Sequence, residues 1–300
     1  MSFSDLEFFA HIARKENLSE AALELYVTPS AVSRRLGRLE DRLGVRLVNR
    51  STRTFALTAE GEAYYATALD VIGRVRMAEE KLRGEAGELT GILRINATIK
   101  FGRTLIAPAI SEFVRLNPGV HAQLILSDAA QNLVQGGYDL GIRLMPEGQD
   151  ADVRRLVFRN RRYLCASPEY LLREGTPVRL SQLIEHNCIT LRQQNEAFDT
   201  WNLETKGEVH SVRVQGTLNS NDGDVALGWT VAGHGIMLRS EWDIAPLVAN
   251  GQLRLIMPEY SQNGDVYAVT SKQNEASEKV WAFVDLLSQS LLAHPRVTGD

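Results

Sequence analysis

The stretch that decides the fold of the N-terminal region reads TPSAVSRRLGRLEDRLG over residues 28–44. Thr28 is a favoured N-cap residue and Pro29 suits the first helical position, so the stretch predicts a helix that begins here. Its apolar residues recur at spacings of four, three and four and form one stripe: Val32, Leu36, Leu39 and Leu43. Gly44 follows as a residue that readily adopts the left-handed conformation and ends a helix.

The opposite face of this helix carries short polar and arginine side chains, at Ser30, Ser33, Arg34, Arg35 and Arg38. Short side chains let a helix backbone approach the major groove of DNA, and arginines donate hydrogen bonds to guanine and phosphate. The face therefore predicts DNA contacts at Thr28, Pro29, Ser30, Ser33, Arg34, Arg35 and Arg38.

The flanking segments complete a winged helix-turn-helix. An amphipathic helix starts near Ser4 or Asp5, a second short helix is expected with Ser19 as its N-cap, and residues 26–27 form the turn. Beyond Gly44, residues 45–48 and 54–57 read as two short strands around a polar turn. Arg50 and Arg53 lie in that turn, where they are expected to reach the DNA backbone or minor groove.

A long helix is predicted from Thr58 to Arg83, with Gly84 and Gly87 marking a hinge after it. A helix of this length exceeds the ordinary range, and its apolar spacing suits pairing with a partner helix. The pattern thus favours a homodimer or homotetramer.

The net charge of the chain is −4, which taken alone argues against nucleic acid as a partner. The average hides an asymmetry, because residues 28–58 contain seven arginines and two carboxylates, a local charge of +5. The pair Glu40–Asp41 within this segment is expected to form i,i+4 ion pairs along the helix. The chain also lacks a long apolar run and a cysteine framework, so a cytoplasmic protein without a membrane anchor is expected.

The remaining two hundred residues alternate between strand and helix patterns. Strands are expected at 92–97, 120–126, 139–144, 188–191, 235–238 and 266–270, with a helix that opens at Thr98, one that starts at Ser127–Asp128, and later ones near 225–231 and 281–286. This alternation predicts an α/β fold built from two parallel βαβ units. Ligands in such folds bind beyond the carboxyl ends of the strands.

Strand ends therefore supply the candidate ligand residues: Thr98, Ile99, Lys100, Ser127, Asp128, Arg143, Arg192, Gln193, Asn219 and Ser220. Thr98 is the first choice, although it can equally be an N-cap. Lys100 favours an anionic ligand, with a solvated surface lysine as the alternative, and Arg143 can instead be a structural ion-pair partner.

Other chemistries find no support in the sequence. The six histidines are scattered and no Cys-x-x-Cys pair occurs, so neither a metal site nor a cofactor is expected. Cys188 lies in an apolar run and reads as a packed core residue. The alternatives left open are a small-molecule binding protein without DNA regulation and, with no catalytic constellation to support it, an enzyme.

Several motifs closely resemble those of the LysR-type transcriptional regulators. They include Ser19–Ala22, Thr28–Arg34, Leu39–Leu47 and Leu57–Gly61 in the first sixty residues. Downstream, Gly136–Arg143, Ala166–Leu171 and Gly233–Ile236 are similar to signatures of the effector domain of that family.

The resemblance implies a non-enzymatic regulator that binds double-stranded DNA and responds to a small-molecule effector, with a carboxylate the expected class. It divides the chain into a DNA-binding domain at 1–58, a linker helix and hinge at 59–88, and a two-lobed, periplasmic-binding-protein-like effector domain at 89–300. Lobe I would comprise 89–161 and 266–300, and lobe II 162–265. The resemblance also adds RNA polymerase to the partners to be considered.

Overall fold

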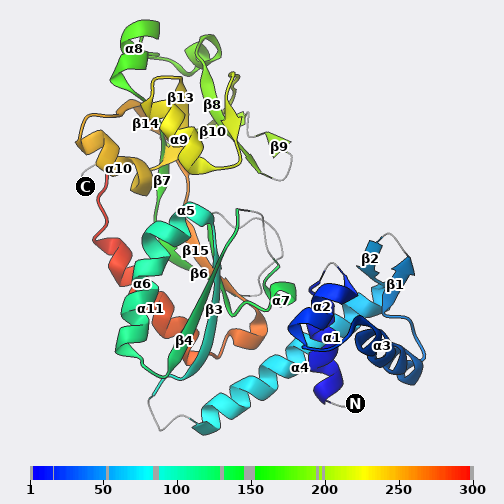
Figure 1. Cartoon of the computed structure of the whole chain (residues 1–300). Coiled ribbons are helices and arrows are strands. Elements are labelled where there is room, and N and C mark those ends of the chain that lie inside the picture. Colours follow the sequence, from blue (N-terminus) through cyan, green and yellow to red (C-terminus); the bar gives the residue numbers. More distant parts are fainter. Residues whose placement is uncertain are drawn as a thin grey trace.

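The computed structural model describes residues 3–15, 17–51, 54–83, 88–128, 132–144, 153–193, 196–197 and 200–297. Figure 1 shows three parts in chain order: a small N-terminal head, a long helix, and a sensor made of two α/β lobes. The predicted fold class, a winged helix-turn-helix followed by a two-lobed α/β domain, is therefore confirmed.

The head contains three helices, α1 (Phe3–Ile12), α2 (Leu18–Glu24) and α3 (Pro29–Leu43). The oxygen of the Thr28 side chain accepts the N–H of Ala31 and Gly44 adopts φ 72°, so both predicted ends of α3 are confirmed. The predicted cap of α2 is wrong, because Asn17 rather than Ser19 accepts the N–H of Glu20. The buried stripe of α3 packs with α1 and α2 around Phe9 and Leu36.

The wing is a hairpin of β1 (Val48–Ser51) and β2 (Thr54–Leu57), paired with Val48 opposite Leu57 and Ser51 opposite Thr54. The predicted first strand at 45–48 is therefore displaced, and residues expected in the turn belong to β1. Thr58 then caps α4 (Ala59–Arg83), accepting the N–H of Gly61 at 2.9 Å. With 25 residues, α4 is about 37 Å long. The predicted hinge at residues 84–87 lies outside the described residues.

Lobe I has a five-stranded sheet in the order β4-β3-β5-β15-β6. Its strands are β3 (Gly91–Ala97), β4 (Val120–Leu126), β5 (Leu140–Leu144), β6 (Val153–Phe158) and β15 (Val266–Thr270). Helical segments accompany the sheet: α5 (Ile99–Phe101), a π turn (Gly102–Ile106), α6 (Ala107–Leu116), α7 (Leu133–Gly136), η3 (Lys272–Asn274) and α11 (Glu278–Leu292). Ser127 and Asp128, where a helix was expected to start, are not helical, and the next described helix begins at Leu133.

Lobe II has an eight-stranded sheet, whose main path is β11-β10-β14-β7-β13-β8-β12. The strands are β7 (Arg161–Ala166), β8 (Cys188–Gln193), β9 (Glu196–Ala197), β10 (Thr200–Thr205), β11 (Glu208–Arg213), β12 (Asn219–Ser220), β13 (Ile236–Ser240) and β14 (Arg254–Asn263). Its helices are α8 (Pro168–Glu174), η2 (Leu180–Glu185), α9 (Gly223–Val231) and α10 (Glu241–Ala249).

The prediction of parallel units holds for only part of each sheet. β3 pairs in parallel with β4 and β5, and β8 with β12 and β13, but β15 and β6 are antiparallel in lobe I. Lobe II also contains an antiparallel hairpin, β10–β11, that the periodicity did not reveal.

The chain crosses between the two sheets twice, after β6 and after β14, so neither lobe is a continuous segment (Figure 1). Trp242 of α10 packs against Phe101 of lobe I with ring centroids 5.2 Å apart. At the other end of the chain, the N–H of Val297 donates to Glu241 in lobe II at 2.9 Å. These contacts hold the lobes face to face around a cleft.

Candidate functional site

The N-terminal half of α3 presents the predicted DNA-binding face to solvent. Thr28, Pro29 and Ser30 are exposed and Ser33 is partly exposed. Arg34 is exposed, and among the described residues its polar contact is a long hydrogen bond from Nε to the carbonyl of Ser30, at 3.5 Å. No described carboxylate therefore forms an ion pair with Arg34.

Arg35, also predicted to bind DNA, is turned toward α1. Its guanidinium donates to the carbonyl and the hydroxyl of Ser4 at 2.7 and 2.6 Å and lies 4.3 Å from the centroid of the Phe8 ring. These bonds hold α3 on α1, and a contact of Arg35 with DNA stays a prediction. Arg38 is exposed and has no ion-pair partner among the described residues. The side chain of Arg50 and the whole of Arg53 lie outside the described residues.

Glu40 organises the start of the wing, a role that the sequence did not reveal. Its side chain is buried, and its carboxylate accepts the N–H groups of Leu47 at 2.9 Å and Val48 at 3.2 Å, together with Arg46 at 2.9 Å. The expected i,i+4 pairing along α3 is therefore wrong for Glu40. The nearby Arg42 pairs instead with Asp5 of α1, at 2.9 Å.

The second candidate site is the cleft between the lobes. Four of the predicted ligand residues line it: Thr98, Ile99, Lys100 and Asp128. Thr98 precedes α5 but makes no side-chain capping bond, and Asp128 accepts the N–H of Ile99 at 2.9 Å. The turn after β3 is thereby fixed, while the Thr98 hydroxyl is not used as a cap.

Ion pairs between the lobes close this cleft. Lys100 of lobe I contacts Asp224, and its Nζ lies 2.8 Å from Asp243. Arg103 adds a longer contact of 3.7 Å to Asp224. The interpretation of Lys100 as a solvated surface residue is therefore wrong, and its charge is already balanced by two carboxylates of lobe II.

Arg162 at the start of β7 also lines the cleft, and the sequence did not suggest it. It has no carboxylate partner among the described residues, whereas its neighbour Arg239 pairs with Asp243 at 2.5 Å. Burial, and then the charge of Arg239, lowers the pKa of Arg162 below its ordinary value. Nearby, the indole N–H of Trp242 is buried without an acceptor. The cleft thus holds two donors that the described part of the protein leaves unpaired.

Ser127, Arg143, Asn219 and Ser220 are not among the described residues that line the cleft. Arg143 turns back on its own strand region and donates to the carbonyls of Asn96 and Ile142 at 3.1 and 3.3 Å. Ser127 donates its N–H to Ala97, and Asn219 and Ser220 are held in β12, so that Asn221 just after them reaches the cleft instead. The side chains of Arg192 and Gln193 lie outside the described residues.

Both cysteines are inaccessible. Cys165 and Cys188 are fully buried, and burial raises the pKa of each thiol to about 12. Within the described ranges, no group of three or more His, Cys, Asp or Glu side chains is arranged to bind a metal ion. None of the described helices combines the length and apolar character needed to cross a bilayer.

Comparison with known proteins agrees with this geometry. Residues 3–62 match the bacterial regulatory helix-turn-helix protein family of the lysR type, and residues 86–292 match the LysR substrate binding domain. The chain belongs to the LysR family of transcriptional regulators. It is accordingly a DNA-binding regulator with an effector-binding domain, and not an enzyme.

Similar regulators align with nearly the whole chain. The transcriptional activator TtdR of Escherichia coli is 36% identical over 284 residues, covering 95% of this chain and 92% of TtdR. The E. coli regulator DmlR is 34% identical over 291 residues, covering 97% and 95%. Among solved structures, CrgA of Neisseria meningitidis has a TM-score of 0.61 at 26% identity, covering 97% and 99% of the two chains.

Proposed function

We propose that this LysR-type regulator binds a two-fold symmetric operator as a homodimer or homotetramer. The observation that supports this most directly is the face of α3, where Ser30 and Arg34 are exposed and Arg34 has no ion-pair partner among the described residues. Paired recognition helices contact half-sites about one DNA turn apart, and the long α4 offers a surface through which two chains can pair.

The effector is an organic anion that binds in the cleft between the lobes. Arg162 supports this assignment, since it is the cleft cation that no described carboxylate neutralises. A carboxylate suits a guanidinium because it accepts two parallel hydrogen bonds, and the unpaired N–H of Trp242 supplies a further donor. Thr98 and Lys100 lie at the same cleft and complete the ligand-binding side of lobe I.

Entry of an anion would change the balance of charge that holds the lobes together. Lys100 is shared between Asp224 and Asp243, so a bound carboxylate competes with these side chains for it. The effector thereby shifts the population of lobe arrangements, and a shift in the sensor is passed to the DNA-bound heads. Because TtdR is named a transcriptional activator, we infer that RNA polymerase is a partner of this chain as well.

The test has two parts. Operator DNA is first selected from a random pool with the full chain, and its affinity is measured over a range of salt concentrations. A regulator of this kind loses affinity steeply as salt rises, because phosphate contacts release counterions. If the selection yields no shared sequence, operator binding is contradicted.

A thermal-shift screen of small carboxylates then searches for the effector, since a ligand of the native state raises the melting temperature. Arg162→Met should abolish the stabilisation by any acid found while leaving operator affinity without ligand unchanged. Arg154→Met, on lobe I, is the matched control, because Arg154 is not a cleft residue. An equal response of wild type and Arg162→Met would exclude Arg162 as the anion contact.

A further inference from the structure

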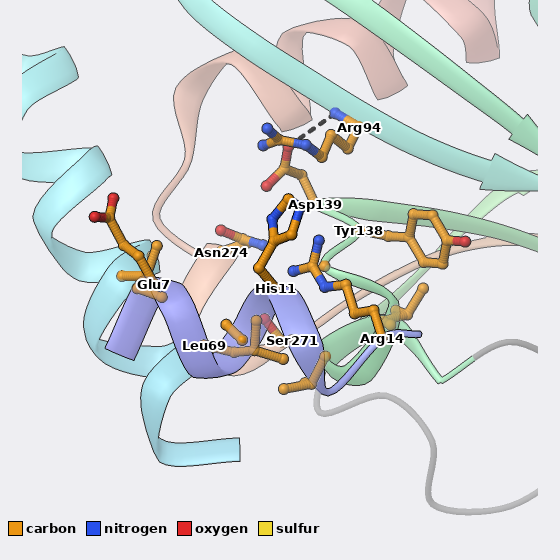
Figure 2. Close-up of a pocket in the computed structure, with 15 residues that line it drawn as sticks. Glu7, His11, Arg14, Leu69, Arg94, Tyr138, Asp139, Ser271 and Asn274 are labelled. Atoms are coloured by element: carbon orange, nitrogen blue, oxygen red, sulfur yellow. Dashed lines mark hydrogen bonds between the residues drawn. The ribbon is translucent and has the colours of Figure 1, made fainter. Parts of the chain in front are cut away.

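A second cavity lies where the DNA-binding head and α4 meet lobe I (Figure 2). Its walls come from α1, the turn after it and α4 on one side, and from β3, α7, the turn before β5 and the segment after β15 on the other. The cavity has a volume of about 340 Å³, whereas the cleft between the lobes has about 90 Å³. Ligand pockets in proteins start at about 300 Å³, so this junction cavity is large enough for a small molecule as it stands.

Arg14, in the turn after α1, supplies a positive charge to the junction cavity. Its Nε donates to the hydroxyl of Tyr65 on α4 at 3.1 Å. Its guanidinium also lies against Gly137 of lobe I, where a Cβ would come within 2.5 Å of Nη2. None of the carboxylates that the structure describes forms an ion pair with Arg14. Arg14 is therefore held in place by neutral groups, with its charge not neutralised.

The other charged groups around the cavity are engaged elsewhere or lie at its rim. The buried carboxylate of Asp139 accepts the backbone N–H of Arg94 at 2.8 Å, and His11 lies 2.7 Å from Glu24. Glu7 is exposed at the surface. Figure 2 shows His11 of α1 and Arg14 of the following turn, with both side chains on the side of Asp139. The guanidinium of Arg14 is thus the group best placed to receive an anion.

The remaining walls are suited to an apolar body with a polar end. Leu69 and Ile72 of α4 and Leu133 of α7 line the cavity. On the sensor side, Ser271 makes no side-chain capping bond to η3, and the side chain of Asn274 lies beside it. These groups match a small organic monoanion, with its carboxylate on Arg14 and its hydrocarbon part between α4 and α7.

The junction cavity and the cleft lie at opposite ends of the same two strands. Arg94 on β3 and Asp139 before β5 line the cavity, while Thr98 after β3 and Leu144 at the end of β5 line the cleft. A ligand in either place therefore lies against the same pair of strands in the lobe I sheet. We propose that the junction cavity is a second ligand site, which takes a small organic monoanion and joins the DNA-binding head to its own sensor.

Equilibrium dialysis of the full chain against labelled pentanoate tests this site, with uncharged pentanamide as the matched ligand. Wild type should bind pentanoate at the junction and pentanamide much more weakly. Arg14→Gln keeps a donor but removes the charge, and should weaken the junction site at least about tenfold, the size of one charge-assisted hydrogen bond. Tyr65→Phe, which frees Arg14 from its anchor, should weaken it less.

Arg162→Met separates this site from the cleft. Pentanoate bound at the junction should remain in Arg162→Met and be lost in Arg14→Gln, and only cleft binding should change the fluorescence of Trp242, which lines the cleft. Absence of pentanoate binding to wild type, or binding that Arg14→Gln leaves unchanged, would overturn the proposal. Melting temperatures of the variants check that they are folded. If the assignment of Arg162 to the cleft ligand fails, the comparison of Arg14→Gln with wild type still tests the junction cavity.

Discussion

The DNA-binding head and the cleft between the lobes are both rich in arginine and carboxylate, but they use these charges differently. In the head, Arg35, Arg42 and Arg46 are tied to Ser4, Asp5 and Glu40. In the cleft, Lys100 and Arg239 are tied to Asp243. Each region also contains cations without an ion-pair partner among the described residues, such as Arg34 on the exposed face of α3 and Arg162 inside the cleft.

The difference lies in where the partners come from. The pairs of the head form within the first fifty residues, so a short segment assembles and also exposes its own DNA-binding face. Lys100 and Asp243 are far apart in sequence and meet only when two lobes close. Charge in the head therefore builds a rigid surface, whereas charge in the cleft holds an interface that a ligand can open.

The largest expected effect concerns the buried carboxylate of the head. Glu40→Ala leaves the N–H groups of Leu47 and Val48 without an acceptor, which should lower the free energy of unfolding of the head by about 3–5 kcal/mol. Asp41→Ala, at the exposed neighbouring position, should change it by less than about 0.5 kcal/mol. Thermal denaturation measures both, and equal melting temperatures would refute the role assigned to Glu40.

The next effect separates two adjacent arginines. Arg34→Ala should weaken operator binding by about 1–3 kcal/mol, the range for a bidentate base contact, with little change in melting temperature. Arg35→Ala should mainly lower stability, because its bonds to Ser4 hold α1 against α3. Anisotropy titrations at one salt concentration, combined with melting curves, distinguish the two. The reverse pattern would show that the DNA-binding face is misassigned.

In the cleft, Lys100→Met should cost about 1–2 kcal/mol, since it removes a partly buried cation from two carboxylates of the opposite lobe. Arg103→Met is its control, because Arg103 is 66% exposed and makes only the 3.7 Å contact; it should cost less than about 0.5 kcal/mol. Small-angle scattering should also show a more open sensor in Lys100→Met. An unchanged profile would mean that these pairs do not hold the lobes together.

The smallest effect is a gain in stability. Tyr26, in the turn before α3, has φ 54° and is 96% exposed. Asn and Gly tolerate this left-handed conformation better than Tyr, so Tyr26→Asn should raise the free energy of unfolding by about 1 kcal/mol. Denaturant titration measures the change, and a loss of stability would show that the exposed ring makes a contact worth more than the strain.

Local elements were predictable because short-range rules decide them. The helix α3 is determined by Thr28 at its start, by the apolar stripe that includes Leu36, and by Gly44 at its end. Both ends were predicted correctly because these signals act locally. Asn17 was missed because two good capping residues, Asn17 and Ser19, lie close together, and local rules do not select between them. The β10–β11 hairpin was missed because the alternation is confined to β10, where Trp201 and Leu203 are buried, whereas β11 has no buried residue.

By itself, the sequence determined the DNA-binding head, the long helix, the α/β class of the sensor and the family to which the chain belongs. Only the tertiary structure decided which charged side chains have partners within the protein and which face solvent or a ligand site. Arg34 and Arg35 are adjacent and chemically identical, yet one faces solvent and the other α1. Arg162 lies in the cleft because the chain crosses twice between the lobes. The Coulomb interaction between two charges depends on their distance in space, which their separation in the sequence does not give.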